Sequence, residues 1–170
     1  MKIRLAADLQ TDSIVDGVGI RTVIWTQGCS HNCPGCHNPG THDFNGGDLV
    51  ELEDVIEELE NLSGQDGVTF SGGDPMMQVE AYTELASFVK QKGMNVWCYT
   101  GFTFEELIKF SEKNDNYLKA LKQTDVLVDG KFIIDLKSFD VQFRGSSNQR
   151  IIDVPKSLES GSVVVITKYK

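Results

Sequence analysis

Residues 22 to 36 read TVIWTQGCSHNCPGC, in which a β-branched strand runs directly into a loop that holds Cys29, Cys33 and Cys36. Three cysteines this close can turn their thiolates toward one point, and thiolates select soft metals: zinc, copper(I) or the iron of iron-sulfur clusters. A structural zinc site needs four ligands, and a complete 4Fe-4S cluster takes four cysteines. The loop therefore predicts either a zinc site completed by His31 or His37, or a 4Fe-4S cluster with one open iron.

Length and composition limit the class of protein. A chain of 170 residues has the length of one domain, so we expect a single domain over residues 1–170. The net charge of -9 argues against a nucleic-acid partner, which would need clustered Lys and Arg. Neither an export signal nor an apolar run of about 18 residues is evident. Four cysteines, three of them in one loop, do not form a secreted disulfide framework, so we expect a cytoplasmic protein with no membrane partner.

Outside the cysteine loop, β-branched runs alternate with amphipathic segments, which predicts an α/β fold. Two helix starts carry capping boxes, one at Asp48 with Glu51 and one at Thr103 with Glu106. Cys98 lies alone in a strand, where we expect a small buried apolar residue rather than a metal ligand. The expected strands are 22–25, 68–70, 94–99, 125–129, 151–154 and 162–167, and the expected helices are 49–62, 76–92 and 103–121.

Polar and glycine residues follow three of these strands. Ser71-Gly72-Gly73-Asp74-Pro75 ends the second strand and is, on its own, a glycine-rich turn of a kind common in α/β proteins. Its two glycines allow other groups to approach the backbone closely, and the carboxylate adds a negative charge. Thr100 follows the third strand. Asp129 and Lys131 end the fourth, where they form either a ligand site or a surface turn.

Four features in chain order carry a family resemblance: VDGVGIR at 15–21, CSHNCPGC at 29–36, SGGDP at 71–75, and VLVDGKF at 126–132 followed by FRGSSNQR at 143–150. Together they resemble the activating component of the anaerobic (class III) ribonucleotide reductases. Such activating components are radical S-adenosylmethionine (SAM) enzymes that activate glycyl radical enzymes. The resemblance extends from residue 14 to residue 152. The FRGSSNQR loop is the discriminating feature, because other activases share the first three in some form.

The resemblance implies a cofactor and a reaction. Cys29, Cys33 and Cys36 would hold one 4Fe-4S cluster whose fourth iron is chelated by SAM. Reduction of the cluster by a low-potential donor such as flavodoxin would cleave SAM to methionine and a 5′-deoxyadenosyl radical. That radical would remove a hydrogen atom from a glycine Cα in the large reductase subunit. We therefore expect an oxidoreductase with this large subunit as its partner.

The resemblance also implies roles for residues around the cluster. Gly35 stands where many radical SAM loops carry an aromatic residue near the adenine, so the backbone of His37 and Asn38 is a candidate for that contact. Arg144 would pair either with the SAM carboxylate or with the reductase, and Asp16 would contact the backbone of its glycine loop. The candidates for the SAM amino group are Gly72, Gly73 and Asp74, and those for its ribose or carboxylate are Thr100, Asp129 and Lys131.

The resemblance and the length together predict the architecture. A complete eightfold α/β barrel takes about 250 residues, so this chain predicts an incomplete, open partial barrel of the radical SAM type. An open side would admit a protein loop. Two alternatives stay open at this point. One is an activase of another glycyl radical enzyme, of the formate-lyase type; the other is a non-enzymatic zinc or iron-sulfur binding module.

Overall fold

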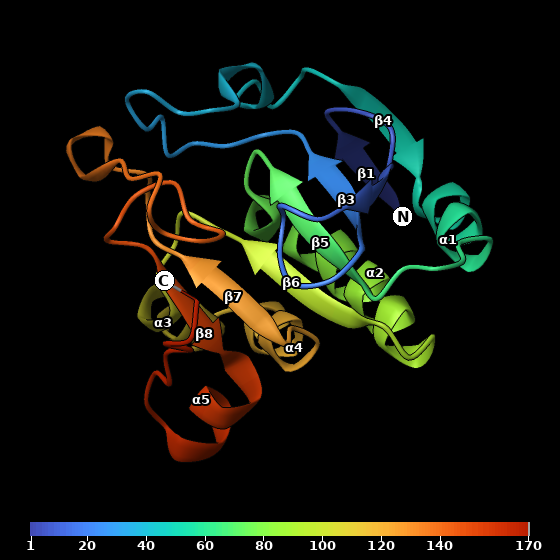
Figure 1. Cartoon of the computed structure of the whole chain (residues 1–170). Helices are drawn as coiled ribbons and strands as arrows, with labels where there is room; N and C mark the ends of the chain where they lie inside the picture. Colours follow the sequence, from blue (N-terminus) through green and yellow to red (C-terminus); the bar gives the residue numbers. More distant parts are fainter. Residues whose placement is uncertain (170) are drawn as a thin grey trace.

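The computed structural model describes residues 1–169, which form a mixed α/β fold around one eight-stranded sheet (Figure 1). The strand order is β4-β1-β3-β5-β6-β7-β8, and β2 pairs with β3 outside this path. Within the described part of the chain, β4 and β8 are two separate edges and do not pair with each other. The sheet is therefore open, which confirms the prediction of an incomplete barrel.

The centre of the sheet is parallel, with β3, β5, β6 and β7 paired in that order, and its flanking strands are antiparallel. The loops that follow the four parallel strands consequently lie at one edge of the sheet, where α/β enzymes place their chemistry. The strands are β1 Lys2–Leu5, β2 Gln10–Ser13, β3 Arg21–Thr26, β4 Asp48–Glu51, β5 Gly67–Gly72, β6 Asn95–Tyr99, β7 Val126–Asp129 and β8 Arg150–Asp153.

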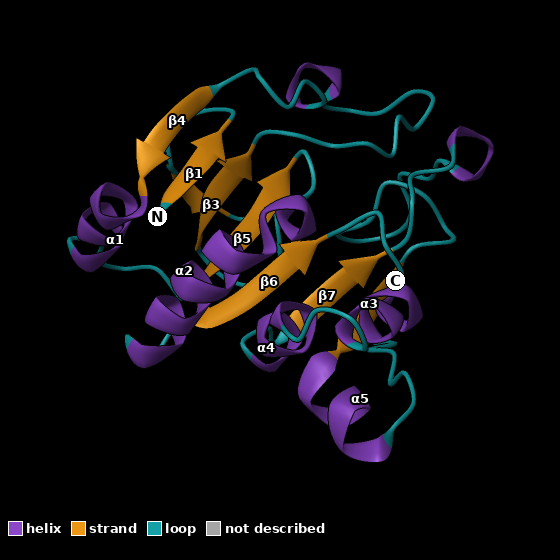
Figure 2. Ribbon diagram, turned by 180° about the vertical axis from the view of Figure 1, so that it is seen from behind, coloured by secondary structure: helices purple, strands orange, loops and turns teal. Residues whose placement is uncertain are grey.

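The helices cover one face of this sheet, as Figure 2 shows from behind. Side chains alternate between the two faces along each strand. Phe70 and Cys98 belong to the core beneath the helices. Trp97 belongs to a smaller cluster, which contains no residue of the helices. Cys98 is fully buried, as expected of a small core residue. The helices are α1 Leu52–Glu60, α2 Val79–Gln91, α3 Phe104–Ser111, α4 Asn116–Lys122 and α5 Val154–Ser160, with short 3-10 turns at Pro39–Thr41, Pro75–Gln78 and Ile134–Leu136. None of the described helices is long and apolar enough to cross a membrane.

The predicted capping box at Asp48 is wrong. Residues Asp48–Glu51 form β4, which pairs with β1 in antiparallel register from Lys2↔Glu51 to Leu5↔Asp48. Helix α1 starts only at Leu52, and its N-cap makes no side-chain hydrogen bond. The backbone of this segment is engaged by a strand some 45 residues earlier, a pairing that local sequence does not encode.

Two further boundaries differ from the prediction. The helix expected over 103–121 starts at the predicted Thr103–Glu106 capping box but splits into α3 and α4. An Asn-rich turn separates them, in which the Asn114 side chain accepts a hydrogen bond from the Asn116 backbone. The segment after β8 is also different. Asp153 caps α5, whose first turn holds Pro155, and 162–167 contributes a single bridge to β8 instead of a strand.

Candidate active site

The cysteine loop leaves β3 at the carboxyl edge of the sheet and is held between two neighbouring segments. On one side, the Gly28 and Cys29 backbone N–H groups donate to the carbonyls of Thr41 and His42, at 2.7 and 3.1 Å. On the other side, the Asp74 backbone N–H donates to the Gly28 carbonyl at 3.0 Å. The start of the loop is therefore held by backbone hydrogen bonds on both sides.

Cys29, Cys33 and Cys36 line one cavity of about 120 Å³. All three side chains are half-buried, and burial raises the pKa of the Cys29 thiol to about 11. Coordination of iron requires the thiolate, so cluster binding at this position releases a proton. Of the other predicted residues, Gly72, Gly73 and Thr100 line the same cavity.

The three thiols fit an iron-sulfur cluster better than a single zinc ion. In the described residues, no three His, Cys, Asp or Glu side chains are grouped tightly enough to hold one metal ion. The His31 ring is engaged with Asp74, and the His37 ring lies against Phe132 with 4.9 Å between centroids. A four-iron cluster is broader than one ion and uses a different iron for each cysteine, so thiols spaced around one cavity suit it.

Gly72 and Gly73 are required by close backbone contact. A Cβ added at Gly72, where φ is +104°, would lie 2.4 Å from the Thr26 carbonyl oxygen. A Cβ at Gly73 would lie 2.5 Å from the Gly28 carbonyl oxygen. These glycines thus allow the loop after β5 to pack against the start of the cysteine loop, a reason that the sequence alone did not indicate.

Asp74 connects three loops from within the protein. Its side chain is 1% exposed, and its carboxylate accepts hydrogen bonds from Met76 N at 3.0 Å, Thr100 Oγ1 at 2.9 Å and Gly101 N at 2.9 Å. The Nε2 atom of His31, in the cysteine loop, lies 2.5 Å from Asp74 Oδ2. The Asp74 carboxylate is therefore engaged by the three loops that surround it, and the structure does not bring it into the cysteine cavity.

Asp129 has a similar internal position. Its buried carboxylate accepts from Phe104 N at 2.8 Å and from the guanidinium of Arg150, which also binds Glu105. These hydrogen bonds raise the pKa of Arg150, and the bond from Arg150 lowers the pKa of Glu105. Asp129 thus holds the start of α3 to β8. The structure does not bring Asp129 into the cysteine cavity, and Lys131 lines a different cavity beside α3.

A second cavity, of about 350 Å³, continues from the first, because both are lined by Cys36, Ser71 and Tyr99. It brings together four predicted residues from three separate parts of the chain, namely Asp16, His37, Asn38 and Arg144. Residues that sequence reasoning missed also line these cavities: His42, Ser71, Tyr99, Phe132 and Gln149. The sequence contained one indication for Tyr99: it is the last residue of a predicted strand, and such strand ends lie at the site.

Two arginines hold the segments that line this second cavity. Arg21, the last residue of the VDGVGIR motif, is fully buried and donates from Nε to Thr69 Oγ1 at 2.7 Å. Thr69 in turn donates to the Asp16 carbonyl at 2.7 Å, which fixes the segment that carries Asp16. The Arg144 guanidinium donates to the Gln149 carbonyl at 3.3 Å, so the FRGSSNQR loop is closed on itself.

Known proteins resemble this chain along most of its length. The 4Fe-4S single cluster domain family matches residues 15–152. The anaerobic ribonucleoside-triphosphate reductase-activating protein of Escherichia coli K12 is 35% identical over 144 residues, which cover 80% of this chain and 90% of the relative. The protein of the same name from Enterobacteria phage T4 is 35% identical over 143 residues, covering 81% and 86%.

Two other similarities are less extensive. A pyruvate formate-lyase-activating enzyme of Clostridium pasteurianum is 34% identical over 134 residues, which cover 75% of this chain and 52% of the relative. Among solved structures, QueE from Escherichia coli superposes with a TM-score of 0.49 at 17% identity, over 61% of this chain and 54% of QueE. From its sequence relatives, the chain belongs to the family of the anaerobic ribonucleoside-triphosphate reductase-activating proteins, within the 4Fe-4S single cluster domain family.

Proposed function

We propose that this protein is a radical SAM activase that generates a glycyl radical on the large subunit of an anaerobic ribonucleotide reductase. The observation that carries the proposal is the cavity in which Cys29, Cys33 and Cys36 meet the backbone of Gly72 and Gly73, in a chain of this family. When bound, the reduced 4Fe-4S cluster supplies one electron to SAM, which is cleaved to methionine and the 5′-deoxyadenosyl radical that removes hydrogen from glycine. The reaction belongs in the reducing cytoplasm, with a low-potential donor such as flavodoxin.

The residues of the cysteine cavity divide into ligands and supports. The three cysteines bind the cluster, and their half-burial limits access of water and oxygen to it. Gly72, Gly73 and Thr100 line the space where the amino acid part of SAM would lie. Asp74 acts as a positioning residue, because its carboxylate binds both Thr100 and His31 of the cysteine loop and so fixes their relative positions.

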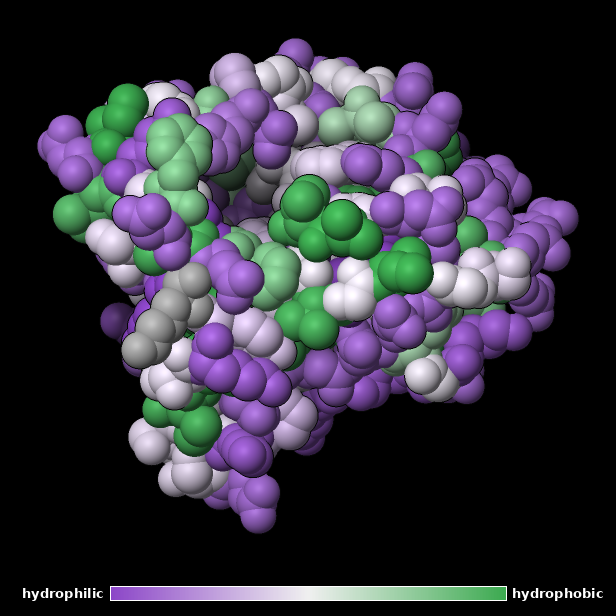
Figure 3. All heavy atoms as spheres, viewed as in Figure 1, coloured by the Kyte–Doolittle hydropathy of each residue, from purple (hydrophilic) through white to green (hydrophobic). Residues whose placement is uncertain are grey.

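The wider second cavity is the proposed site for the adenosyl part of SAM and for the partner's glycine loop. His37 and Asn38 follow Cys36 in the chain and line this cavity, as do Asp16 and Arg144. Ile14, Val15 and Val18 are exposed beside Asp16, and Figure 3 shows apolar residues gathered beside a hollow on this face. Exposed apolar residues beside a hollow are typical of protein interaction sites, and they suit a flexible protein loop that must enter between the open edges of the sheet.

The test is cleavage of SAM by the reconstituted protein. Iron and sulfide are added without oxygen, dithionite is the reductant, and 5′-deoxyadenosine is measured beside a Cys33→Ala control. We expect product from the wild type and none from the control. A tight zinc protein that takes up no cluster would overturn the proposal and favour a binding module.

A second assay decides the partner. The loaded protein is incubated with the large anaerobic reductase subunit or with pyruvate formate-lyase, and the glycyl radical is quantified by electron paramagnetic resonance. We expect the signal on the reductase only. A signal on pyruvate formate-lyase alone would assign this chain to the other type of activase.

A further inference from the structure

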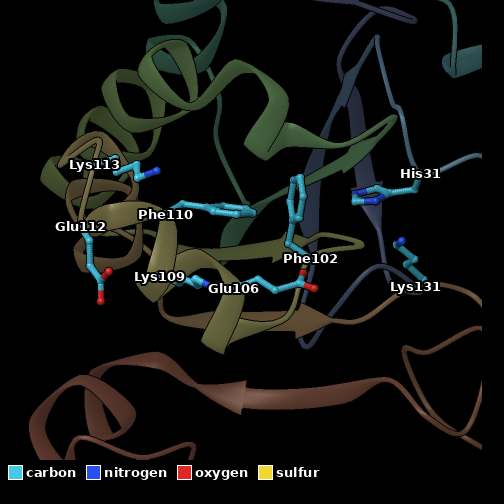
Figure 4. Close-up of a pocket in the computed structure, with 8 residues that line it drawn as sticks. All are labelled: His31, Phe102, Glu106, Lys109, Phe110, Glu112, Lys113 and Lys131. Atoms are coloured by element: carbon cyan, nitrogen blue, oxygen red, sulfur yellow. The ribbon is translucent and has the colours of Figure 1, made fainter.

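A third cavity, of about 420 Å³, lies on the other side of the cysteine loop, beside α3 (Figure 4). Its floor is formed by Phe102 and Phe110, whose rings meet edge to face with centroids 5.2 Å apart. Lys109, Lys113 and Lys131 stand around it. The function proposed above uses neither this floor nor these lysines.

The charge of this cavity is opposite to that of the protein. The chain has a net charge of -9, yet three lysines surround one apolar floor. Within residues 1–169, none of the three forms an ion pair. Two acidic residues, Glu106 and Glu112, also line the cavity, so its lysines exceed its carboxylates by one. The cavity therefore has a small net positive charge in a protein of opposite net charge, which favours an anionic partner.

An aromatic path connects this cavity to the cysteine loop. His31 lines both the third cavity and the cavity of the three cysteines, and in sequence it lies between Cys29 and Cys33. Its ring meets Phe102 edge to face with 4.5 Å between centroids. Figure 4 shows Phe110, Phe102 and His31 in one row, which leads from α3 to the cysteine loop.

The third cavity lies on a different side of the protein from the second cavity, where the reductase loop would enter. Helix α3 lies on the helical face of the sheet, behind the strands in Figure 1, whereas the segment between β2 and β3 crosses in front of them. That front segment carries Asp16 and lines the second cavity. A molecule bound over Lys109 and Lys113 therefore leaves the second cavity free.

We propose that the third cavity is the docking site of an acidic one-electron carrier protein, whose reduced cofactor edge is placed over Phe102 and His31. The step transfers one electron and no atoms: the carrier is oxidised by one electron and the cluster is reduced by one. The side chains on the rim are exposed, so the site is an open depression and not the enclosed pocket that a small ligand needs. The inference rests on the proposed function, which requires a reduced cluster.

The test measures reduction of the cluster by flavodoxin hydroquinone in anaerobic stopped flow, followed by cluster absorbance. The variant is the double charge reversal Lys109→Glu with Lys113→Glu. The matched control is Lys92→Glu with Lys122→Glu, which changes the net charge equally at two other exposed helix ends. Electrostatic steering changes association rates by about 10- to 1,000-fold, so we expect the variant to be at least ~10-fold slower and its salt dependence to flatten.

The comparison with dithionite separates this inference from the proposed function. All proteins should produce 5′-deoxyadenosine with dithionite at similar rates, because a small reductant does not need the docking site. Equal slowing of variant and control with flavodoxin, or no slowing of either, would overturn the docking site. Absence of SAM cleavage by the dithionite-reduced wild type would instead overturn the proposed function, whatever the rate of reduction by flavodoxin.

Discussion

Asp74→Asn should weaken the fold where the cysteine loop meets the ends of β5 and β6. The carboxylate has two acceptor oxygens: Oδ1 accepts from Met76 N, and Oδ2 accepts from Gly101 N and faces His31 Nε2. Asparagine replaces one of these oxygens with an NH2 donor. In either orientation of the amide, one buried backbone N–H faces another donor and loses its partner.

The size of the effect follows from these contacts. A buried N–H left without a partner costs about 1–3 kcal/mol. Loss of the carboxylate also weakens the remaining hydrogen bonds, because bonds to an ionised acceptor are roughly twice as strong as neutral ones. Together we expect the free energy of unfolding to fall by about 2–4 kcal/mol, a large part of the roughly 5–15 kcal/mol of an ordinary domain.

Urea unfolding of the cluster-free protein under reducing, anaerobic conditions measures this change. The matched control is Asp43→Asn, since Asp43 is exposed and its side chain accepts a hydrogen bond only from Asn45 N within the described residues. We expect that control to stay within about 0.5 kcal/mol of the wild type. A loss at Asp74 no larger than at Asp43 would refute the conclusion that this carboxylate holds the three loops together.

Three further changes test other parts of the structure. Gly101→Ala would place a Cβ 2.5 Å from the histidine ring of the cysteine loop, so iron loading should fall, whereas Gly40→Ala, with open space around it, should load normally. Cys98→Ala should leave the iron content after reconstitution unchanged, because this buried thiol lies in the core; a loss of iron would contradict its assignment. Glu105→Gln should destabilise the fold at pH 7. The hydrogen bond from Arg150 lowers the pKa of Glu105 below its ordinary value of 4.5. The extra free energy of unfolding of the wild type, measured in urea, should therefore disappear as the pH falls below that value. A difference that grows on acidification would contradict this.

Local patterns predicted the elements that local physics controls. The β-branched run before the cysteines forms β3, and the Thr103–Glu106 capping box starts α3 with both of its hydrogen bonds in place. Each of these features depends on residues within a few positions of one another, so the sequence was sufficient to find it.

The errors lie where distant segments compete with a local preference. Asp48 has the chemistry of a helix cap, but its backbone is taken by β1. Asp129 stays a predicted ligand from its place at a strand end, and its carboxylate accepts hydrogen bonds from Arg150 and from the start of α3. Where a side chain can have two roles, the partner that the fold brings to it determines which role it takes.

The sequence by itself determined the family, the three cysteines of the loop after the first predicted strand, and the position of the other motifs directly after predicted strands. These depend on residue type and spacing, which the chain states directly. Only the tertiary structure decided that Asp74 bonds to His31 and Thr100, and that Lys109, Lys113 and Lys131 surround an aromatic floor beside the cysteine loop. Such contacts join residues that are far apart in the sequence, and their energies depend on distance and burial, which exist only once the chain has folded.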